Sequence, residues 1–279
     1  MSADSSNSKP GHKQRASRRP ARRRAKTHQP APGRNHHPQA ILTIDVGGSR
    51  VKILASGQTE PRRRPTGPQM TPQDMVAAVQ EMAKGWDYEA ISLGYPGQVG
   101  DDGPRSEPGN LGPGWVGFNF AAAFGTPVRI MNDAAMQALG SYDGGRMLFL
   151  GLGTGLGSTL IAGGVIVPLE LGQLLAPGGG LLGEKLSRAG LRRLGKRQWR
   201  KLLDRVVPAL AAAFLADAVV LGGGNVKKLK SPPQGARLSN NLTAFRGGFR
   251  LWHLDDVKTL SGDEGPPAAP TPKFDWRVI

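Results

Sequence analysis

Three apolar segments of this sequence end in glycine-rich turns, and this repetition constrains the fold more than any other feature. The turns lie in IDVGGSRVK, LGLGTGLGS and VVLGGGN. Each apolar run has the length of a buried strand. Glycine tolerates positive φ and lets backbone N–H groups converge on an anion without a Cβ in the way. One such turn is typical of a plain hairpin, but three of them with acids at strand ends favour a protein that binds phosphate groups.

The rest of the body alternates predicted strands with predicted helices. Ordered structure should begin at Ile41, with two strands joined by a glycine turn in 41–57. Further strands are expected at 90–97, 128–133, 146–167 and 218–225. Helices are expected at 71–85, 134–142 and 186–216, with a short one after the loop 110–120. This alternation predicts an α/β fold.

Capping residues indicate where the predicted helices begin and end. Thr71 is a suitable N-cap, Pro72 fits the first turn, and Gly85 fits the stop of the first helix. Asp133 is placed to cap the helix at 134–142. Pro208 should kink or divide the long helix at 186–216, because proline lacks the N–H that a helix interior needs.

The net charge of +16 is concentrated at the N-terminus. Residues 1–40 hold ten basic residues and one acid, Asp4, which gives +9 and leaves +7 for the rest. This arm has almost nothing to bury, so it is expected to be disordered. It is either a solvated tail without a dedicated role or a weak contact for RNA, DNA or polyphosphate. The Pro-rich tail at 257–279 is also expected to be flexible.

Composition also excludes several kinds of site. The chain holds no cysteine, which rules out disulfides, thiolate metal sites and cysteine nucleophiles. No apolar run approaches the roughly 20 residues that span a bilayer, so no membrane contact is expected. These features predict a cytoplasmic protein.

The order of the motifs resembles that of the ROK sugar kinases, and within them the glucokinases and polyphosphate glucokinases. It reads IDVGGSRVK, GYPG, NLGPGW, NDAAMQALG, GLGTGLGSTL, ELG and VVLGGGN, over roughly residues 41–252. The resemblance implies a two-lobed, actin-like (ribonuclease H-like) ATPase fold with a central cleft. The lobes would comprise residues 41–130 and 131–256.

The resemblance also implies which residues hold the phosphoryl donor. The first phosphate turn would comprise Gly47, Gly48 and Ser49. The second would comprise Gly153, Thr154, Gly155, Gly157 and Ser158. The motif beside a bound nucleoside would comprise Gly222, Gly223, Gly224 and Asn225. Asp45 could hold Mg²⁺ directly or through water, and Lys52 either steadies phosphate or forms a surface salt bridge.

Asp133 is the expected catalytic base. A sugar hydroxyl is a poor nucleophile near neutral pH, and a carboxylate can accept its proton as the oxygen attacks phosphorus. The glycine turns would stabilise the charge on the transferring group. A simpler interpretation makes Asp133 only a helix cap. For the sugar itself, the resemblance implies contacts from Asn110, Asn132, Asp133, Glu170 and Gln173.

The chain departs from the family on the sugar side. Gln173 stands where family members carry a histidine, and glutamine can hydrogen-bond hydroxyls but cannot become a cation or bind zinc as imidazole does. The Cys-rich zinc motif is missing as well, so no zinc is expected. The segment from Glu170 to Gly222 is shorter than the resemblance leads us to expect. Trp115 in NLGPGW either closes on the substrate or anchors its loop.

These features predict a hexokinase-type kinase that uses Mg²⁺ and transfers a phosphoryl group from ATP or inorganic polyphosphate to a hexose. Glucose, converted to glucose 6-phosphate, is the expected acceptor. The main alternative is a catalytically degenerate sugar- or phosphate-binding protein. A sugar-responsive transcriptional regulator is a weaker alternative, because residues 1–40 are too short and polar for a winged helix. A hydrolase of the same superfold is a further, less favoured alternative. Family members are commonly dimers, which implies a homodimer.

Overall fold

The computed structural model describes residues 38–240, 242–254 and 277–278. The predicted disorder of the arm therefore falls outside the described residues, apart from its last three positions. The same holds for the predicted flexibility of the tail, apart from 277–278.

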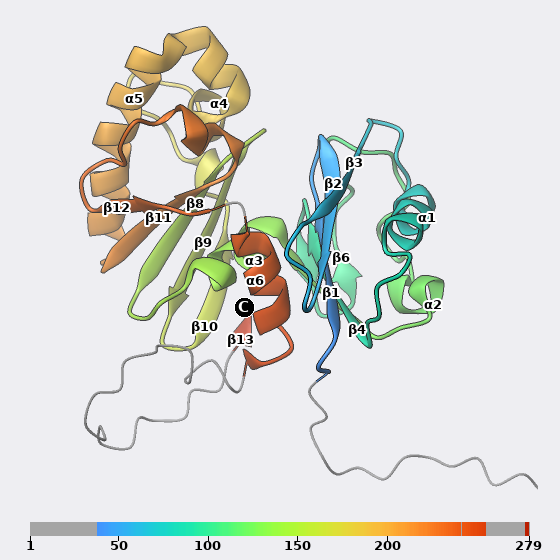
Figure 1. Cartoon of the computed structure of the whole chain (residues 1–279). Coiled ribbons are helices and arrows are strands. Elements are labelled where there is room, and N and C mark those ends of the chain that lie inside the picture. Colours follow the sequence, from blue (N-terminus) through green and yellow to red (C-terminus); the bar gives the residue numbers. More distant parts are fainter. Residues whose placement is uncertain (1–37, 241, 255–276, 279) are drawn as a thin grey trace, which may run out of the picture. The chain divides into compact units, whose positions relative to one another are not determined.

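The first sheet has five strands in the order β3-β2-β1-β4-β7 (Figure 1). They are β1 (Ile41–Val46), β2 (Arg50–Ala55), β3 (Arg62–Pro65), β4 (Ala90–Tyr95) and β7 (Val128–Asn132). Strands β1 to β3 form an antiparallel meander, and β4 and β7 continue the sheet in parallel to β1. All residues of β1 and β4 are buried, as expected for strands covered on both faces. The predicted start at Ile41 and the predicted strands at 41–57 and 90–97 are confirmed.

The second sheet has six strands in the order β12-β11-β8-β9-β10-β13. They are β8 (Met147–Leu152), β9 (Leu156–Ala162), β10 (Val165–Leu169), β11 (Ala218–Gly222), β12 (Ala236–Leu238) and β13 (Arg277–Val278). Strands β8 to β10 are antiparallel, whereas β11 runs parallel to β8. A small hairpin of β5 (Val99–Gly100) and β6 (Gly103–Pro104) forms a separate two-stranded sheet that contacts β7. Strands predicted over 146–167 and 218–225 are confirmed.

The helices follow the predicted order along the chain. They are α1 (Pro72–Met82), α2 (Phe120–Phe124), α3 (Asp133–Ser141), α4 (Leu182–Leu186), α5 (Arg188–Ala213) and α6 (Thr243–Arg250), with 3₁₀ turns η1 (Leu171–Gln173) and η2 (Gly224–Lys228). At the start of α1, Thr71 and Asp74 cap each other's backbone N–H groups in a capping box, so the predicted N-terminus is confirmed. None of the described helices is long and apolar enough to cross a membrane.

Helices α3 and α6 pack against each other between the two sheets (Figure 1). Helix α6 contacts β1 and β4, whereas α3 also contacts β8, β9 and β10 of the other sheet. The two helices cross at glycine, because a Cβ on Gly140 would clash with the Thr243 carbonyl and one on Gly247 with the Met136 carbonyl. Close backbone contact at this crossing fixes α3 relative to β1, which matters because α3 begins with Asp133.

Two local predictions are wrong. The N-cap of α3 is Asn132, and Asp133 is the first helical residue. The break in the long helix lies at Gly195 and not at Pro208, because Gly195 takes φ 71° and ψ 159° while the backbone stays helical through Pro208. Glycine occupies that left-handed region at little cost, so the chain breaks there first.

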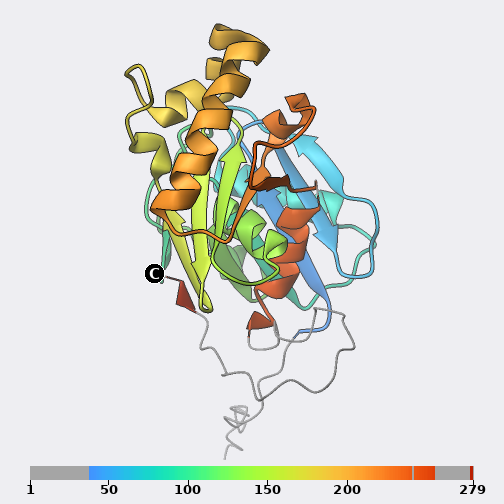
Figure 2. The same cartoon turned by 90° about the vertical axis from the view of Figure 1, so that its left-hand side faces the viewer.

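Each sheet carries its own apolar core. In the first, α1 buries Met75 and Val79 against the strands. In the second, α5 buries Trp199, Leu203 and Val207 over β8 and β11 (Figure 2). The predicted boundary between lobes at 130/131 falls inside β7, and the division into lobes stays a prediction.

Candidate functional site

Asp133 lies where β7 passes directly into α3. Asn132 caps this helix: its Oδ1 accepts from the N–H groups of Ala134 (3.0 Å) and Ala135 (3.1 Å), and its Nδ2 donates to the Gly97 carbonyl (3.0 Å). Asp133 Oδ1 accepts from Ala134 N at 2.8 Å. Since the Asn132 amide is engaged at both ends, one N–H of its Nδ2 remains for the sugar contact that the sequence suggested.

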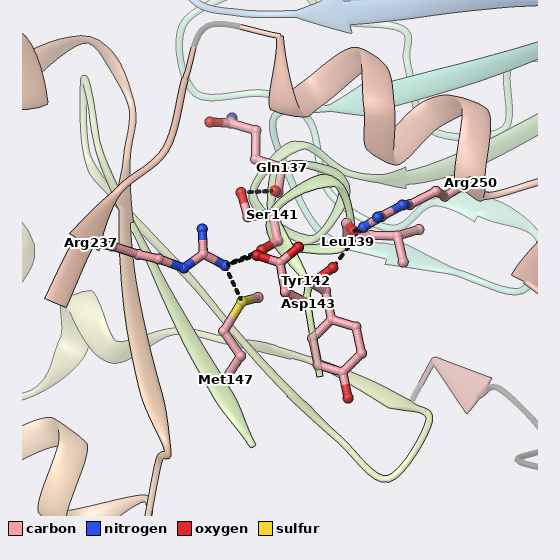
Figure 3. Close-up of polar contacts among 8 residues, drawn as sticks. All are labelled: Gln137, Leu139, Ser141, Tyr142, Asp143, Met147, Arg237 and Arg250. Atoms are coloured by element: carbon pink, nitrogen blue, oxygen red, sulfur yellow. Dashed lines mark hydrogen bonds and ion pairs between the residues drawn. The ribbon is translucent and has the colours of Figure 1, made fainter. Parts of the chain in front are cut away.

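The other end of α3 is held by two arginines (Figure 3). Arg250 Nη1 donates to the carbonyls of Leu139 and Tyr142, both at 2.8 Å. Arg237 Nη2 donates to the Ser141 carbonyl and pairs with Asp143 Oδ2 at 2.8 Å. Cations at a helix C-terminus satisfy its free carbonyls and oppose its dipole. Helix α3 is thus fixed at both ends, and Asp133 has a defined position.

The surroundings of Asp133 raise its pKa to about 7. Burial of the carboxyl group is the main cause, and the negative charge of Asp45 adds to it, while the Ala134 N–H and Lys52 act in the opposite direction. Asp45 is itself 6% exposed and pairs with Lys52 Nζ at 2.6 Å. The charges of these three side chains interact, so Asp133 lies near Asp45 at the end of β1, the strand that precedes the first glycine turn. A carboxyl with a pKa near 7 is suited to act as a base at neutral pH.

The first glycine turn joins β1 to β2 and is braced from two sides. Gly47 N donates to the Arg50 carbonyl at 3.0 Å, and Thr66 Oγ1 donates to the Gly47 carbonyl at 2.9 Å. A Cβ on Gly48 would lie 3.1 Å from the Cβ of Asn110, so the loop predicted to hold sugar packs directly on this turn. Ser49 is exposed at its tip.

The second glycine turn joins β8 to β9 and is open to solvent. Gly153 N donates to the Gly155 carbonyl at 3.1 Å, which makes the turn tight. A Cβ on Gly153 or Gly155 would meet no atom within 4 Å, and Thr154 is exposed. These N–H groups therefore have room for an anion.

A glycine on β9 lets this second turn lie close to α3, the helix that begins with Asp133. A Cβ on Gly157 would lie 2.8 Å from the Cβ of Ala134, the residue that follows Asp133. Only a residue without a side chain permits this approach between β9 and the first turn of α3. Asp133 is thus adjacent to both glycine turns, to the first through Asp45 and to the second through Gly157.

The third glycine motif, after β11, mainly serves packing. A Cβ on Gly222 would clash with the Phe149 ring, and one on Gly223 would lie 2.5 Å from the Leu152 carbonyl. Asn225 is buried, and its Nδ2 donates to the Gly153 carbonyl at 3.2 Å. Gly224 alone is exposed with open space around it. The motif therefore supports the second turn, and its role beside a nucleoside stays a prediction.

Arg188 is a candidate residue that the sequence did not single out. Its backbone N donates to the Gly153 carbonyl at 2.9 Å, and its Nη1 reaches Ser49 Oγ at 3.5 Å. The side chain is exposed. One arginine thus contacts both glycine turns, although it follows the nearer of the two motifs by about thirty residues and the other by far more. A run of basic residues at 188–205 was the available signal.

A cavity of about 1200 Å³ lies beside two of the predicted sugar contacts. Asn132 and Glu170 line it, together with Gln98, Arg105, Asn119 and Arg129. Asp133, Asn110 and Gln173 are not among its lining residues. The cavity therefore overlaps the predicted sugar contacts only in part.

Glu170 and Gln173 lie at the two ends of one 3₁₀ turn, and both are exposed. Gln173 N donates to the Glu170 carbonyl at 3.0 Å. Ser158 holds this turn: its Oγ donates to the Leu169 carbonyl at 2.7 Å and accepts from Leu171 N at 3.1 Å. Ser158 is 2% exposed, so it positions Glu170 and is turned away from the open phosphate turn in which the sequence placed it.

The fold matches solved structures of sugar kinases. Inorganic polyphosphate/ATP-glucomannokinase from Arthrobacter sp. strain KM gives a TM-score of 0.64 at 24% identity, covering 78% of this chain and 99% of that one. A ROK family glucokinase from Streptomyces griseus gives 0.55 at 20% identity, covering 86% and 93%. No family model matches the sequence.

A curated relative decides the family. Polyphosphate glucokinase of Mycobacterium tuberculosis (strain CDC 1551 / Oshkosh) is 30% identical over 208 residues, covering 66% of this chain and 77% of that protein. The chain belongs to the ROK family of sugar kinases. The predicted actin-like α/β fold and the hexokinase-type class are thereby confirmed.

In this ROK kinase Trp115 is a loop anchor. It is fully buried, its Nε1 donates to the Gly112 carbonyl at 2.8 Å, and its ring contacts Tyr95 and Phe120. Glu107 fixes the same loop by accepting from the N–H groups of Trp115 and Val116. The loop is thus rigid behind Asn110.

The described acidic residues of this ROK kinase fit a magnesium ion that is held by one carboxylate and completed by water and substrate phosphates. Across the described residues there is no cluster of three or more histidine, cysteine, aspartate or glutamate side chains that could enclose a metal. Mg²⁺ commonly needs only one or two carboxylates, with water and substrate phosphates as its other ligands. Asp45 is such a carboxylate at a strand end, beside Asp133.

Proposed function

We infer that this kinase transfers the terminal phosphoryl group of ATP or inorganic polyphosphate to a hexose hydroxyl, with Asp133 as the general base. The observation that carries the proposal is the position of Asp133: it starts a helix fixed at both ends, its pKa is about 7, and it adjoins both glycine turns. A merely capping aspartate would need none of these features, since Asn132 already caps the helix.

The reaction needs one proton acceptor and a set of donors for phosphate. Asp133 takes the proton of the attacking hydroxyl as its oxygen bonds to phosphorus and the bridging P–O bond of the donor breaks. The shortened donor leaves with the electron pair of that bond. N–H groups of the two turns and the guanidinium of Arg188 stabilise the charge on the transferring group. Mg²⁺, held by Asp45 directly or through water, would neutralise further phosphate charge when bound.

For the acceptor, the proposal favours glucose. A relative at 30% identity is named polyphosphate glucokinase, which supports a hexose acceptor. Glu170 can accept hydrogen bonds from two hydroxyls, and Gln173 and Asn110 can donate and accept. Glutamine at 173 replaces a residue that could carry a proton, so this side is where a degenerate protein would first lose turnover.

The test is formation of sugar phosphate from Mg²⁺, a panel of hexoses, and either ATP or polyphosphate. Asp133→Asn should lower kcat by about 10²- to 10⁴-fold, the usual contribution of a positioned base. Asp87→Asn, an exposed aspartate on another loop, is the matched control and should change nothing. An Asp133→Asn protein that keeps full activity would contradict the proposed role. A wild-type protein that is inert with every pair would favour the degenerate alternative.

A further inference from the structure

Helix α5 carries an excess of positive charge that, apart from Arg188, the proposed transfer reaction does not use. Between Arg188 and Ala213 it has eight basic residues and one acid, Asp204, a net +7. That equals the net charge of the whole chain outside residues 1–40, which is +16 less +9. The rest of residues 41–279 therefore has no net charge, and the whole excess of +7 outside the arm lies on helix α5.

These charges are exposed and face away from the apolar core. Exposed positions on the helix include Arg192, Arg193, Lys196, Arg197, Lys201 and Arg205. Trp199, Leu203 and Val207 are buried on the opposite side. Within the described part of the chain, the one ion pair on α5 joins Arg200 to Asp204 at 2.8 Å. The exposed cations thus have no carboxylate partner among the described residues.

Their spacing opposes helix stability. Arg197, Lys201 and Arg205 follow one another at four-residue intervals on one stripe, and Arg188 and Arg192 do so before the break at Gly195. Like charges four residues apart repel and destabilise a helix. A solvated helix would normally alternate acids with bases, so the uniform stripe indicates an anionic ligand.

The stripe begins at the phosphate site. Arg188, the first residue of α5, touches the Gly153 turn through its backbone and Ser49 through its side chain. A second set of exposed cations, Lys227, Lys228 and Lys230, follows the Asn225 that hydrogen-bonds to Gly153. Arg200 Nη1 donates to the Ser231 carbonyl at 2.6 Å, which places this lysine segment beside α5.

We propose that this basic face, from Arg188 to Arg205 with Lys227, Lys228 and Lys230, binds the distal phosphates of a long inorganic polyphosphate whose end lies in the glycine turns. The inference rests on the proposed kinase function. A long chain with one charge per phosphate matches a line of cations and needs no pocket for a base. From Arg197 to Arg205 alone the helix extends about 12 Å, at about 1.5 Å per residue. ATP, with three phosphates, could reach Arg188 but not the far end.

The decisive variant is Arg197→Gln/Lys201→Gln/Arg205→Gln, assayed with long-chain polyphosphate, tripolyphosphate and ATP. We expect KM for the long chain to rise about tenfold or more, because three phosphate contacts are lost, with KM for tripolyphosphate and ATP within about twofold. The slope of log KM for the long chain against log salt should fall by about two, because each lost contact removes roughly 0.7 from it. Lys227→Gln/Lys228→Gln/Lys230→Gln should act in the same direction.

The matched control removes three exposed charges elsewhere, as Arg64→Gln/Lys84→Gln/Arg246→Gln, and should leave all three KM values unchanged. An α5 variant with the same chain-length and salt dependence as wild type would overturn the inference. A wild type that uses ATP but not polyphosphate would also overturn it while the kinase function stands. Failure with every donor would instead refute the proposed function. Single-stranded RNA that binds the wild type more tightly than polyphosphate without slowing the polyphosphate reaction would assign the face to nucleic acid and overturn the inference as well.

Discussion

The predicted phosphate side and the predicted sugar side of this candidate site are held by different means. On the phosphate side, Gly157 and Gly222 let the Ala134 and Phe149 side chains pack closely, Gly223 lets the Leu152 backbone approach, and the buried Asn225 hydrogen-bonds the third motif to the second turn. On the sugar side, Glu170 and Gln173 are exposed side chains at the ends of one 3₁₀ turn. Close packing fixes a geometry within narrow limits, whereas exposed side chains can be exchanged at little cost in stability. This difference predicts that substitutions on the phosphate side will cost more activity than substitutions on the sugar side.

Among the variants that probe this comparison, the largest effect should come from disturbing the packing of the phosphate side. Gly157→Ala places a Cβ 2.8 Å from that of Ala134, which forces β9 and the first turn of α3 apart. A displacement of about 1 Å at a reacting group can cost about 10²-fold in rate, so kcat should fall by that order. Steady-state kinetics on purified protein measures it.

A compensating variant provides the control. Gly157→Ala/Ala134→Gly moves the methyl group from one element to the other and should recover most of the lost kcat. Ala134→Gly alone should cost about 1 kcal/mol of helix stability and little activity. If the double variant is no better than Gly157→Ala, the contact with α3 is not what positions Asp133.

A smaller effect is expected from the cation that bridges the two turns. Arg188→Gln removes one charge at the transferring phosphate, so kcat/KM for the donor should fall about tenfold while KM for the sugar stays unchanged. Arg246→Gln, on an exposed position of α6, is the control. Equal losses for donor and sugar would show that Arg188 acts on the fold and not on the phosphates.

On the sugar side the comparison predicts a milder response. Glu170→Gln keeps the shape of an exposed side chain but weakens its hydrogen bonds to hydroxyls, so KM for the hexose should rise about three- to tenfold. The donor KM should not move. A hundredfold fall in kcat would show that the sugar side is as tightly organised as the phosphate side.

The smallest effect concerns stability and its pH dependence. The pKa of Asp133 is raised in the folded protein, so its contribution to stability is full below about pH 4 and is lost as the pH rises to about 7. Asp133→Asn removes this loss and should raise the free energy of unfolding at pH 8 by about 1 to 4 kcal/mol, with little change at pH 4. Thermal unfolding of both proteins at the two pH values measures it. If the two proteins differ equally in free energy of unfolding at pH 4 and at pH 8, the effect of Asp133 on stability does not come from its ionisation.

Much of the fold was predictable because its signals are local. Strands β1, β4 and β11 are short apolar runs, and α1 begins with a capping box. Strand β3 escaped prediction because all four of its residues are exposed and it shows no apolar alternation. The shift of the α3 cap from Asp133 to Asn132 reflects two adjacent residues that both cap well, which sequence cannot rank.

The site was predictable to the extent that its residues lie in motifs. Asp45, Asp133 and the glycine turns come together as the motif order implied. Arg188 could not be found this way, because its contacts with Gly153 and Ser49 arise from packing between distant segments. The hydrogen bonds of Asn132 and Ser158 to backbone carbonyls could not be predicted either, because the sequence of a motif does not show which partner an amide or hydroxyl will bind.

The central claim is that Asp133 acts as a base with a pKa near 7, and the pH dependence of kcat/KM for the sugar tests it most directly. At saturating donor, the wild type should lose about tenfold per pH unit below pH 7 and level off above it, because only the carboxylate accepts the proton. The residual kcat/KM of Asp133→Asn should not show this fall below pH 7. A wild-type profile that stays flat from pH 8 down to pH 5 would contradict the account.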